Sequence, residues 1–283
     1  MTVLLALVAG LVATVVLERT TRPTFAQPVL DRENYRGHHL PTAAGLLLVA
    51  AVIAVDGART LLGLVGLGDA DTVGPRILVL LVVVAFGFLG LADDLLGDAH
   101  DRGLKGHVGA ALKGRVTTGF VKLGGGAAVA LVVAGAIDGD RPGRVLVDAA
   151  LIALAANMGN LFDRAPGRTL KVGLVASIPL LVIAGTAATG VALAVVVGAG
   201  LGLLPADLRE RSMLGDTGAN AFGAAIGVAT VLTATPTVRV VVAVALLALT
   251  LLSEVVSFSR VIAGVPPLRA LDALGRLPAE ARS

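Results

Sequence analysis

Cysteine and tryptophan are absent from this 283-residue chain, tyrosine occurs once, and charged residues make up only 15% of it. The absence of cysteine excludes disulfides, thiolate nucleophiles and cysteine-ligated metal centres. Soluble domains carry roughly 25% charged residues, so the low charge points away from a soluble protein. Together with 56% hydrophobic residues and 36 glycines, it indicates a membrane protein whose helices pack through small residues.

Nine apolar stretches are long enough to predict transmembrane helices. They are residues 1–17, 42–58, 75–92, 117–137, 145–161, 172–187, 189–204, 218–235 and 239–257. Residues 1–17 are expected to be a retained span, because no basic segment precedes them as it does in a secretory signal. The prediction is an all-α polytopic bundle that forms one domain over residues 1–283. Residues 259–283 are expected to form a cytoplasmic tail with an interfacial helix.

The basic residues of the loops predict how these spans are oriented. Seventeen lysines and arginines lie in the loops after the first, third, fifth, seventh and ninth stretches, whereas five lie in the opposite loops. Because loops rich in lysine and arginine stay in the cytoplasm, we expect the N-terminus outside and the C-terminus inside. The predicted location is the plasma membrane, with the polar motifs on its cytoplasmic side.

Acidic residues mark the predicted cytoplasmic ends of the third and eighth spans. Asp93 and Asp94 end the third span, and adjacent carboxylates near lipid are costly unless they are paired or bind a metal. Asp216 begins the eighth span between Gly215 and Gly218, which suit a close approach to phosphate at a helix N-terminus. Structural roles stay open for both motifs: a solvated helix end for the aspartate pair and an N-cap for Asp216.

A strip of amides and one carboxylate ends the fifth span. Asn157, Asn160 and Asp163 are spaced by three residues, which puts neighbours on one side of a helix. Interhelical hydrogen bonding is the structural alternative for the two amides. Together with the acidic residues, these oxygens are ligands that suit Mg²⁺, and the predicted topology gathers them on one face. The pattern indicates metal-assisted phosphoryl transfer.

Basic residues near these motifs are predicted to bind the phosphate groups of a substrate. They are Lys105, Lys113, Lys122, Arg164 and Arg168. For Lys122, which lies one turn into the fourth span, snorkelling of the ammonium to the interface is the alternative explanation.

Three motifs together resemble the polyprenyl-phosphate N-acetylhexosamine-1-phosphate transferases, a glycosyltransferase family 4 type that includes the phospho-MurNAc-pentapeptide translocase. The motifs are Asp93-Asp94, Asn157-x-x-Asn160-x-x-Asp163 and Leu214-Gly-Asp216-Thr-Gly-Ala. The resemblance covers about residues 1–260 in the same motif order. It implies a transferase of cell-wall or surface-glycan synthesis that moves a phospho-sugar from a UDP-sugar to undecaprenyl or another polyprenyl phosphate, releasing UMP.

The resemblance also implies roles for individual residues and partners. It assigns catalysis to Asp93, Asp94 and Asp216, substrate binding to Asn157, Asn160 and Asp163, and metal binding to Asp216, Asn157 and Asp163. The implied cofactor is Mg²⁺, with Mn²⁺ as the alternative; no nucleic-acid partner is expected, and a homodimer stays open. The family's histidine cluster in the last cytoplasmic loop has no counterpart, because no histidine follows His107. A membrane transporter, a lipid-handling protein or a catalytically weak regulatory paralogue are the alternative functions.

Overall fold

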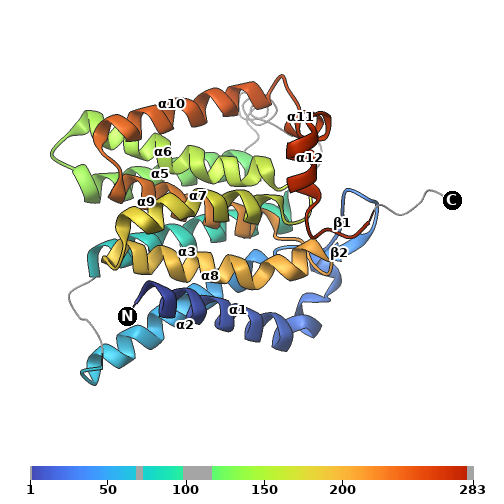
Figure 1. The fold of residues 1–283 in the computed structure, drawn as a ribbon, viewed down its shortest axis with the longest axis horizontal. Coiled ribbons are helices and arrows are strands. Elements are labelled where there is room, and N and C mark those ends of the chain that lie inside the picture. Colours follow the sequence, from blue (N-terminus) through green and yellow to red (C-terminus); the bar gives the residue numbers. More distant parts are fainter. Residues whose placement is uncertain (1, 68–72, 98–116, 279–283) are drawn as a thin grey trace.

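A computed structural model describes residues 2–67, 73–97 and 117–278 as a bundle of helices lying side by side (Figure 1). The long helices are α1 (Val3–Phe25), α2 (Gly45–Leu64), α3 (Val73–Leu96), α5 (Thr118–Asp138), α6 (Pro142–Phe162), α7 (Arg168–Ala184), α8 (Ala188–Leu208), α9 (Gly215–Thr233) and α10 (Pro236–Ser253). Each lies over one of the predicted apolar stretches, and the all-α prediction is confirmed. Seven of them, all except α7 and α9, are long and apolar enough to cross a membrane. The number of spans and their orientation stay predictions.

Small elements gather at one end of the bundle. The 3-10 helix η1 (Pro28–Leu30) leads into a hairpin of β1 (Asp31–Glu33) and β2 (His39–Pro41), which pair antiparallel. The short helices α11 (Phe258–Gly264) and α12 (Pro266–Ala273) follow α10 and lie at the same end (Figure 1). The ring of Phe258 stacks on that of Phe162, with centroids 5.9 Å apart, and this contact ties α11 to the end of α6.

Helices α8 and α9 form the centre of the bundle and are buried along most of their length. Glycines let the neighbouring helices approach α9 closely. A Cβ atom on Gly90 of α3 would lie 2.3 Å from the carbonyl oxygen of Asp216, and one on Gly159 of α6 would lie 2.2 Å from that of Ala219. Because both glycines are near polar motifs, this packing brings the ends of α3 and α6 against the start of α9.

Helix α10 lies at the edge of the bundle, on the outer side of α6 (Figure 1). Ala243 is its one buried residue, and the valines and leucines around it are largely exposed. Such a surface suits contact with lipid rather than with water.

Candidate functional site

Polar side chains from four helices meet at the end of the bundle where α3 and α6 finish and α5 and α9 begin. The ammonium of Lys122 donates to Asp93 Oδ2 at 2.7 Å and also to Asp216 Oδ2. The amide nitrogen of Asn160 donates to the same oxygen of Asp216 at 2.8 Å. The three motifs therefore form one cluster through side chains that are far apart in the sequence.

The two adjacent aspartates of α3 have hydrogen-bond partners on different helices. Asp93 faces α5, where its Oδ1 accepts from Thr118 Oγ1 at 2.7 Å and its Oδ2 pairs with Lys122. Asp94 faces α9, where it accepts from the backbone N–H groups of Asp216 at 2.9 Å and Thr217 at 3.0 Å. The hydroxyl of Thr217 adds a third bond to Asp94 at 2.6 Å.

Asp94 thus caps the N-terminus of α9 from another helix. The first N–H groups of a helix have no partner within it, and its positive end favours a carboxylate. The N-cap role considered for Asp216 belongs instead to Asp94, while Asp216 lies in the first turn of α9 with its side chain turned to Lys122 and Asn160. Capping therefore leaves the Asp216 carboxylate available for other partners.

Asp163 is the C-cap residue of α6, and its partly buried carboxylate makes no hydrogen bond with another described residue. Burial, followed by the negative charges of Asp207 and Asp216, raises the pKa of Asp163 well above its ordinary value. A desolvated carboxylate near other negative charges is stabilised by a proton or by a bound cation. Asp163 therefore adds a further negative charge beside the cluster.

The donor set of the cluster fits a hard divalent cation. The carboxylate of Asp163 and the amide oxygen of Asn160 accept no bond from the described residues, and Asp216 keeps one oxygen outside its bonds to Lys122 and Asn160. Mg²⁺ often takes only one or two protein carboxylates together with substrate phosphates. In the described residues no three acidic or histidine side chains converge as a complete metal cage. The arrangement suits a metal that is held jointly with a substrate.

Two further amides lie one turn deeper in the bundle. Asn157 donates to Thr250 Oγ1 of α10 at 3.3 Å, so the structure directs its amide nitrogen to α10. Asn220 lies four residues after Asp216, on the same side of α9 and only 3% exposed. Its amide nitrogen has no hydrogen-bond partner in the described part of the chain. The sequence carries Asn220 within the Asp216 motif, but nothing local distinguishes it from an ordinary helix residue.

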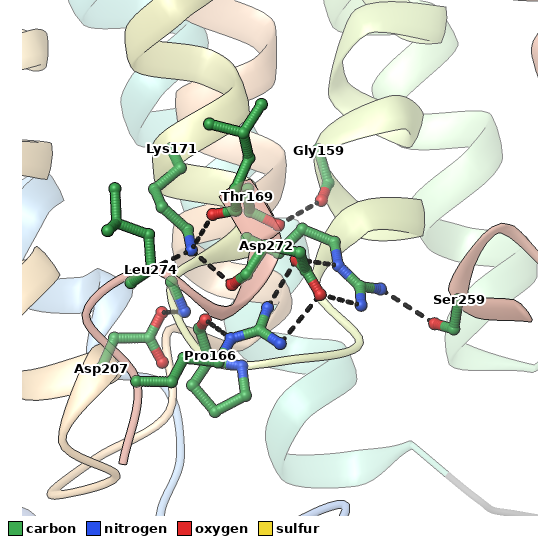
Figure 2. A network of polar contacts seen from close by, with 12 residues as sticks. Gly159, Pro166, Thr169, Lys171, Asp207, Ser259, Asp272 and Leu274 are labelled. Carbon is green, nitrogen blue, oxygen red and sulfur yellow. Dashed lines mark hydrogen bonds and ion pairs between the residues drawn. The ribbon is translucent and has the colours of Figure 1, made fainter. Parts of the chain in front are cut away.

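Arg168 is held by the C-terminal segment (Figure 2). Its guanidinium donates to both carboxylate oxygens of Asp272, at 2.8 and 2.9 Å, and to Ser259 Oγ at 2.8 Å, and it is 6% exposed. Arg276 binds the same carboxylate at 2.6 and 2.8 Å. Burial alone would raise the pKa of Asp272, but the hydrogen bonds from Arg168 and Arg276 hold it below its ordinary value. Sequence reasoning missed Asp272, whose partner Arg168 is remote in the chain.

Lys171 fixes the end of α12 in the same network (Figure 2). Its ammonium donates to the carbonyl oxygens of Leu271 at 3.0 Å, Asp272 at 2.5 Å and Leu274 at 3.2 Å. A cation at the last carbonyls of a helix satisfies groups that have no partner within it. Nearby, the buried Asp207 accepts from the backbone N–H of Gly167 at 2.9 Å. The segment that replaces the expected histidine cluster is therefore docked on α7 and on the loop before it.

The other basic residues predicted to bind phosphate differ in how the structure describes them. Arg164 is exposed, and its side chain makes no hydrogen bond or ion pair with another described residue. Lys105 and Lys113 lie outside the described residues. Lys122 is the one predicted basic contact that the described residues join directly to the acidic motifs.

No family model matches the chain, and a search of curated proteins finds no match. The resemblance of the motifs to the phospho-sugar transferases therefore stays a prediction. The described residues do show a helical bundle with apolar helices that could span a membrane and a charged cluster at one end.

Proposed function

We propose that the protein is a Mg²⁺-dependent membrane transferase that moves N-acetylhexosamine 1-phosphate from a UDP-sugar to polyprenyl phosphate and releases UMP. The observation that carries the proposal is the convergence of Asp93, Lys122, Asn160 and Asp216 from four helices. A polar cluster at one end of an apolar bundle suits a reaction between a lipid and a water-soluble substrate. The proposed setting is the cytoplasmic face of the plasma membrane, in the synthesis of cell-wall or surface glycans.

The proposed reaction is a single phosphoryl transfer. A phosphate oxygen of the lipid attacks the β-phosphorus of the UDP-sugar and forms a new P–O–P bond. The bond between the β-phosphorus and the oxygen bridging to the α-phosphorus breaks, and UMP leaves with that oxygen and its electron pair. Negative charge develops on the transferred group and on the leaving oxygen, so catalysis depends on positioning and on neutralising that charge.

The acidic and amide side chains would hold the cofactor, and Asn160 and Asp94 would position Asp216. Asp216, Asp163 and the amide oxygen of Asn160 are the proposed ligands of Mg²⁺, which supplies charge neutralisation on the substrate phosphates. The amide nitrogen of Asn160 orients Asp216, and Asp94 positions it by capping α9. Asp94 is thus proposed to be a positioning residue.

Lys122 supplies the movable positive charge in this proposal. Its ammonium pairs with both Asp93 and Asp216. An ammonium on a flexible four-carbon chain can exchange one carboxylate for a substrate phosphate while it keeps the other. Asp93, anchored by Thr118, would retain the lysine near the reacting groups.

The test measures UMP release by the full chain in detergent, with UDP-N-acetylglucosamine and undecaprenyl phosphate as substrates. Wild-type protein should release UMP with Mg²⁺ and stop when the metal is chelated. Asp216→Asn should lose at least a hundredfold in rate while the protein stays folded. Asp140→Asn is the matched control, because that aspartate is 75% exposed at the other end of the bundle. Full activity of the Asp216 variant would refute the assignment.

A binding protein without turnover is the second candidate. Two observations favour it: Lys122 lies where a cation would bridge Asp93 and Asp216, and Asp272 draws Arg168 away from any substrate. This candidate predicts that the protein binds the UDP-sugar or the lipid phosphate but releases no UMP. Binding assays run beside the UMP assay separate the two functions.

A further inference from the structure

A pocket of about 470 Å³ lies at the other end of the bundle, between the first turns of α6 and α10. Its lining includes Arg141, Arg144, Val147, Asp148, Arg239 and Val240. These residues belong to the starts of α6 and α10, whereas the Asp216 cluster lies where α6 ends. The pocket is therefore separate from the proposed transferase site.

Arginine side chains from both helices line the pocket. Its lining residues carry three guanidinium groups and one carboxylate, and Asp138 beside the lining pairs with all three arginines. Both helices begin at the pocket with a proline, Pro142 in α6 and Pro236 in α10. The N-terminus of a helix is the positive end of its dipole. Two helix starts and three arginines together favour an anion.

Arg239 is held in place at the pocket by two buried acids. Its Nη1 donates to Asp138 Oδ2 at 2.7 Å and to Asp148 Oδ2 at 2.8 Å, and its Nε donates to the carbonyl oxygen of Ala234 at 3.0 Å. Its Nη2 makes no hydrogen bond within the described part of the chain. An arginine fixed in this way keeps a pair of donors available without losing side-chain freedom on binding.

Arg141 and Arg144 form the accessible part of the pocket. Their side chains are 53% and 42% exposed, and their contacts to Asp138 are long, at 3.3 and 3.8 Å. Arg141 also pairs with the exposed Asp140 at 3.5 Å. Exposed pairs of this kind are weak, so both guanidinium groups can turn to a stronger partner.

Asp148 gives a second, independent indication of a ligand. The residue is 0% exposed, and its Oδ1 is buried without a hydrogen-bond donor among the residues described. A buried carboxylate oxygen without a donor is costly in a native structure. A ligand that brings a hydroxyl group, or a water molecule held with it, would remove that cost.

We propose that this pocket binds the headgroup of an anionic phospholipid, with its phosphate at the arginines and a headgroup hydroxyl serving Asp148. The lipid is favoured over a soluble phosphate because the surface beside the pocket is apolar. Val240, Val241 and Val244 of α10 and Leu146 of α6 are exposed there and suit acyl chains. Phosphatidylglycerol has the required chemistry, since its headgroup carries one phosphate and two hydroxyl groups.

The test uses the full chain in detergent and counts bound lipid by native mass spectrometry. Phosphatidylglycerol is expected to bind at least tenfold more tightly than phosphatidylcholine and to raise the unfolding temperature. Arg141→Gln with Arg144→Gln should lower that affinity at least tenfold. Both side chains are exposed, so the pairs between Arg239 and its two aspartates survive the substitution.

The matched control removes the same charge at the other end of the bundle. Arg209→Gln with Arg260→Gln should bind phosphatidylglycerol as the wild type does, because both arginines are exposed and lie outside the pocket. Equal loss in the two double variants would overturn the proposal, as would equal affinity for the two lipids. Soluble glycerol phosphate that binds as tightly as the lipid would overturn the choice of a lipid.

Discussion

Asp94 offers the sharpest test of how the site is built, because one side chain of α3 caps the start of α9. Replacing it with alanine removes three hydrogen bonds, two of them from backbone N–H groups. Loss of a helix cap costs about 0.5–2 kcal/mol. Loss of a partly buried carboxylate at the positive end of a helix costs up to about 2 kcal/mol more. Because Asp94 combines both roles, we expect Asp94→Ala to destabilise the protein by about 2–4 kcal/mol.

Thermal unfolding of the purified protein in detergent measures this effect. One kcal/mol shifts the unfolding temperature of a domain of this size by roughly 2–4 °C, so a loss of about 2–4 kcal/mol should lower it by roughly 4–16 °C. Asp94→Asn keeps one oxygen for the N–H groups and should lose less. Asp140→Ala is the control, since that exposed side chain lies at the other end of the bundle from the start of α9 and should change the temperature little. An unchanged unfolding temperature in Asp94→Ala would refute the capping argument.

Three further substitutions probe other parts of the same end. Gly159→Ala puts a Cβ atom 2.2 Å from the carbonyl oxygen of Ala219, so we expect a loss of about 1–3 kcal/mol in thermal unfolding, whereas Gly135→Ala, with open space around it, should be neutral. Lys122→Met leaves two acids without their cation, and we expect a lower unfolding temperature that added Mg²⁺ restores; no response to Mg²⁺ would count against the metal site. Asp272 has a lowered pKa, so its contribution to stability is present above 3.8 and is lost as the pH falls through that lowered value. Unfolding scans from pH 7 to pH 3 should therefore show a smaller loss in Asp272→Asn than in the wild type.

The helices could be predicted because long apolar runs are a local signal. Two helix boundaries differ from the prediction, and ion pairs of charged side chains account for both differences. The sequence predicts an end of the first run at residue 17, but α1 continues to Phe25. Within this extension Glu18 and Arg22 pair one turn apart at 2.9 Å, which stabilises the added turns. The sixth run was predicted to begin at residue 172, but α7 begins at Arg168. Asp272 neutralises that arginine from the C-terminal segment, and no local pattern announces such a partner.

The cluster itself could be predicted only in outline. The alternation of spans puts Asp93, Asn160 and Asp216 at one end, and the structure brings them together. The division of labour between Asp93 and Asp94 could not be foreseen, because adjacent helix residues point about 100° apart and packing decides which one meets α9. The same holds for Asn157, whose direction depends on where α10 lies.

Acidic side chains are neutralised in the same way at the two ends of the bundle, but by different cations. At each end one cation lies between two acids: Lys122 between Asp93 and Asp216, and Arg239 between Asp138 and Asp148. Charges inside apolar helices need such partners.

The choice of cation separates the roles proposed for the two ends. A guanidinium makes fixed, planar contacts, which suits a pocket whose walls stay in place while a headgroup enters. An ammonium on a flexible chain is a compact point charge that can change partners. Replacing Lys122 with arginine should therefore keep the cluster paired but impair turnover. The planar guanidinium would bind the two carboxylates too rigidly to exchange one of them for a substrate phosphate.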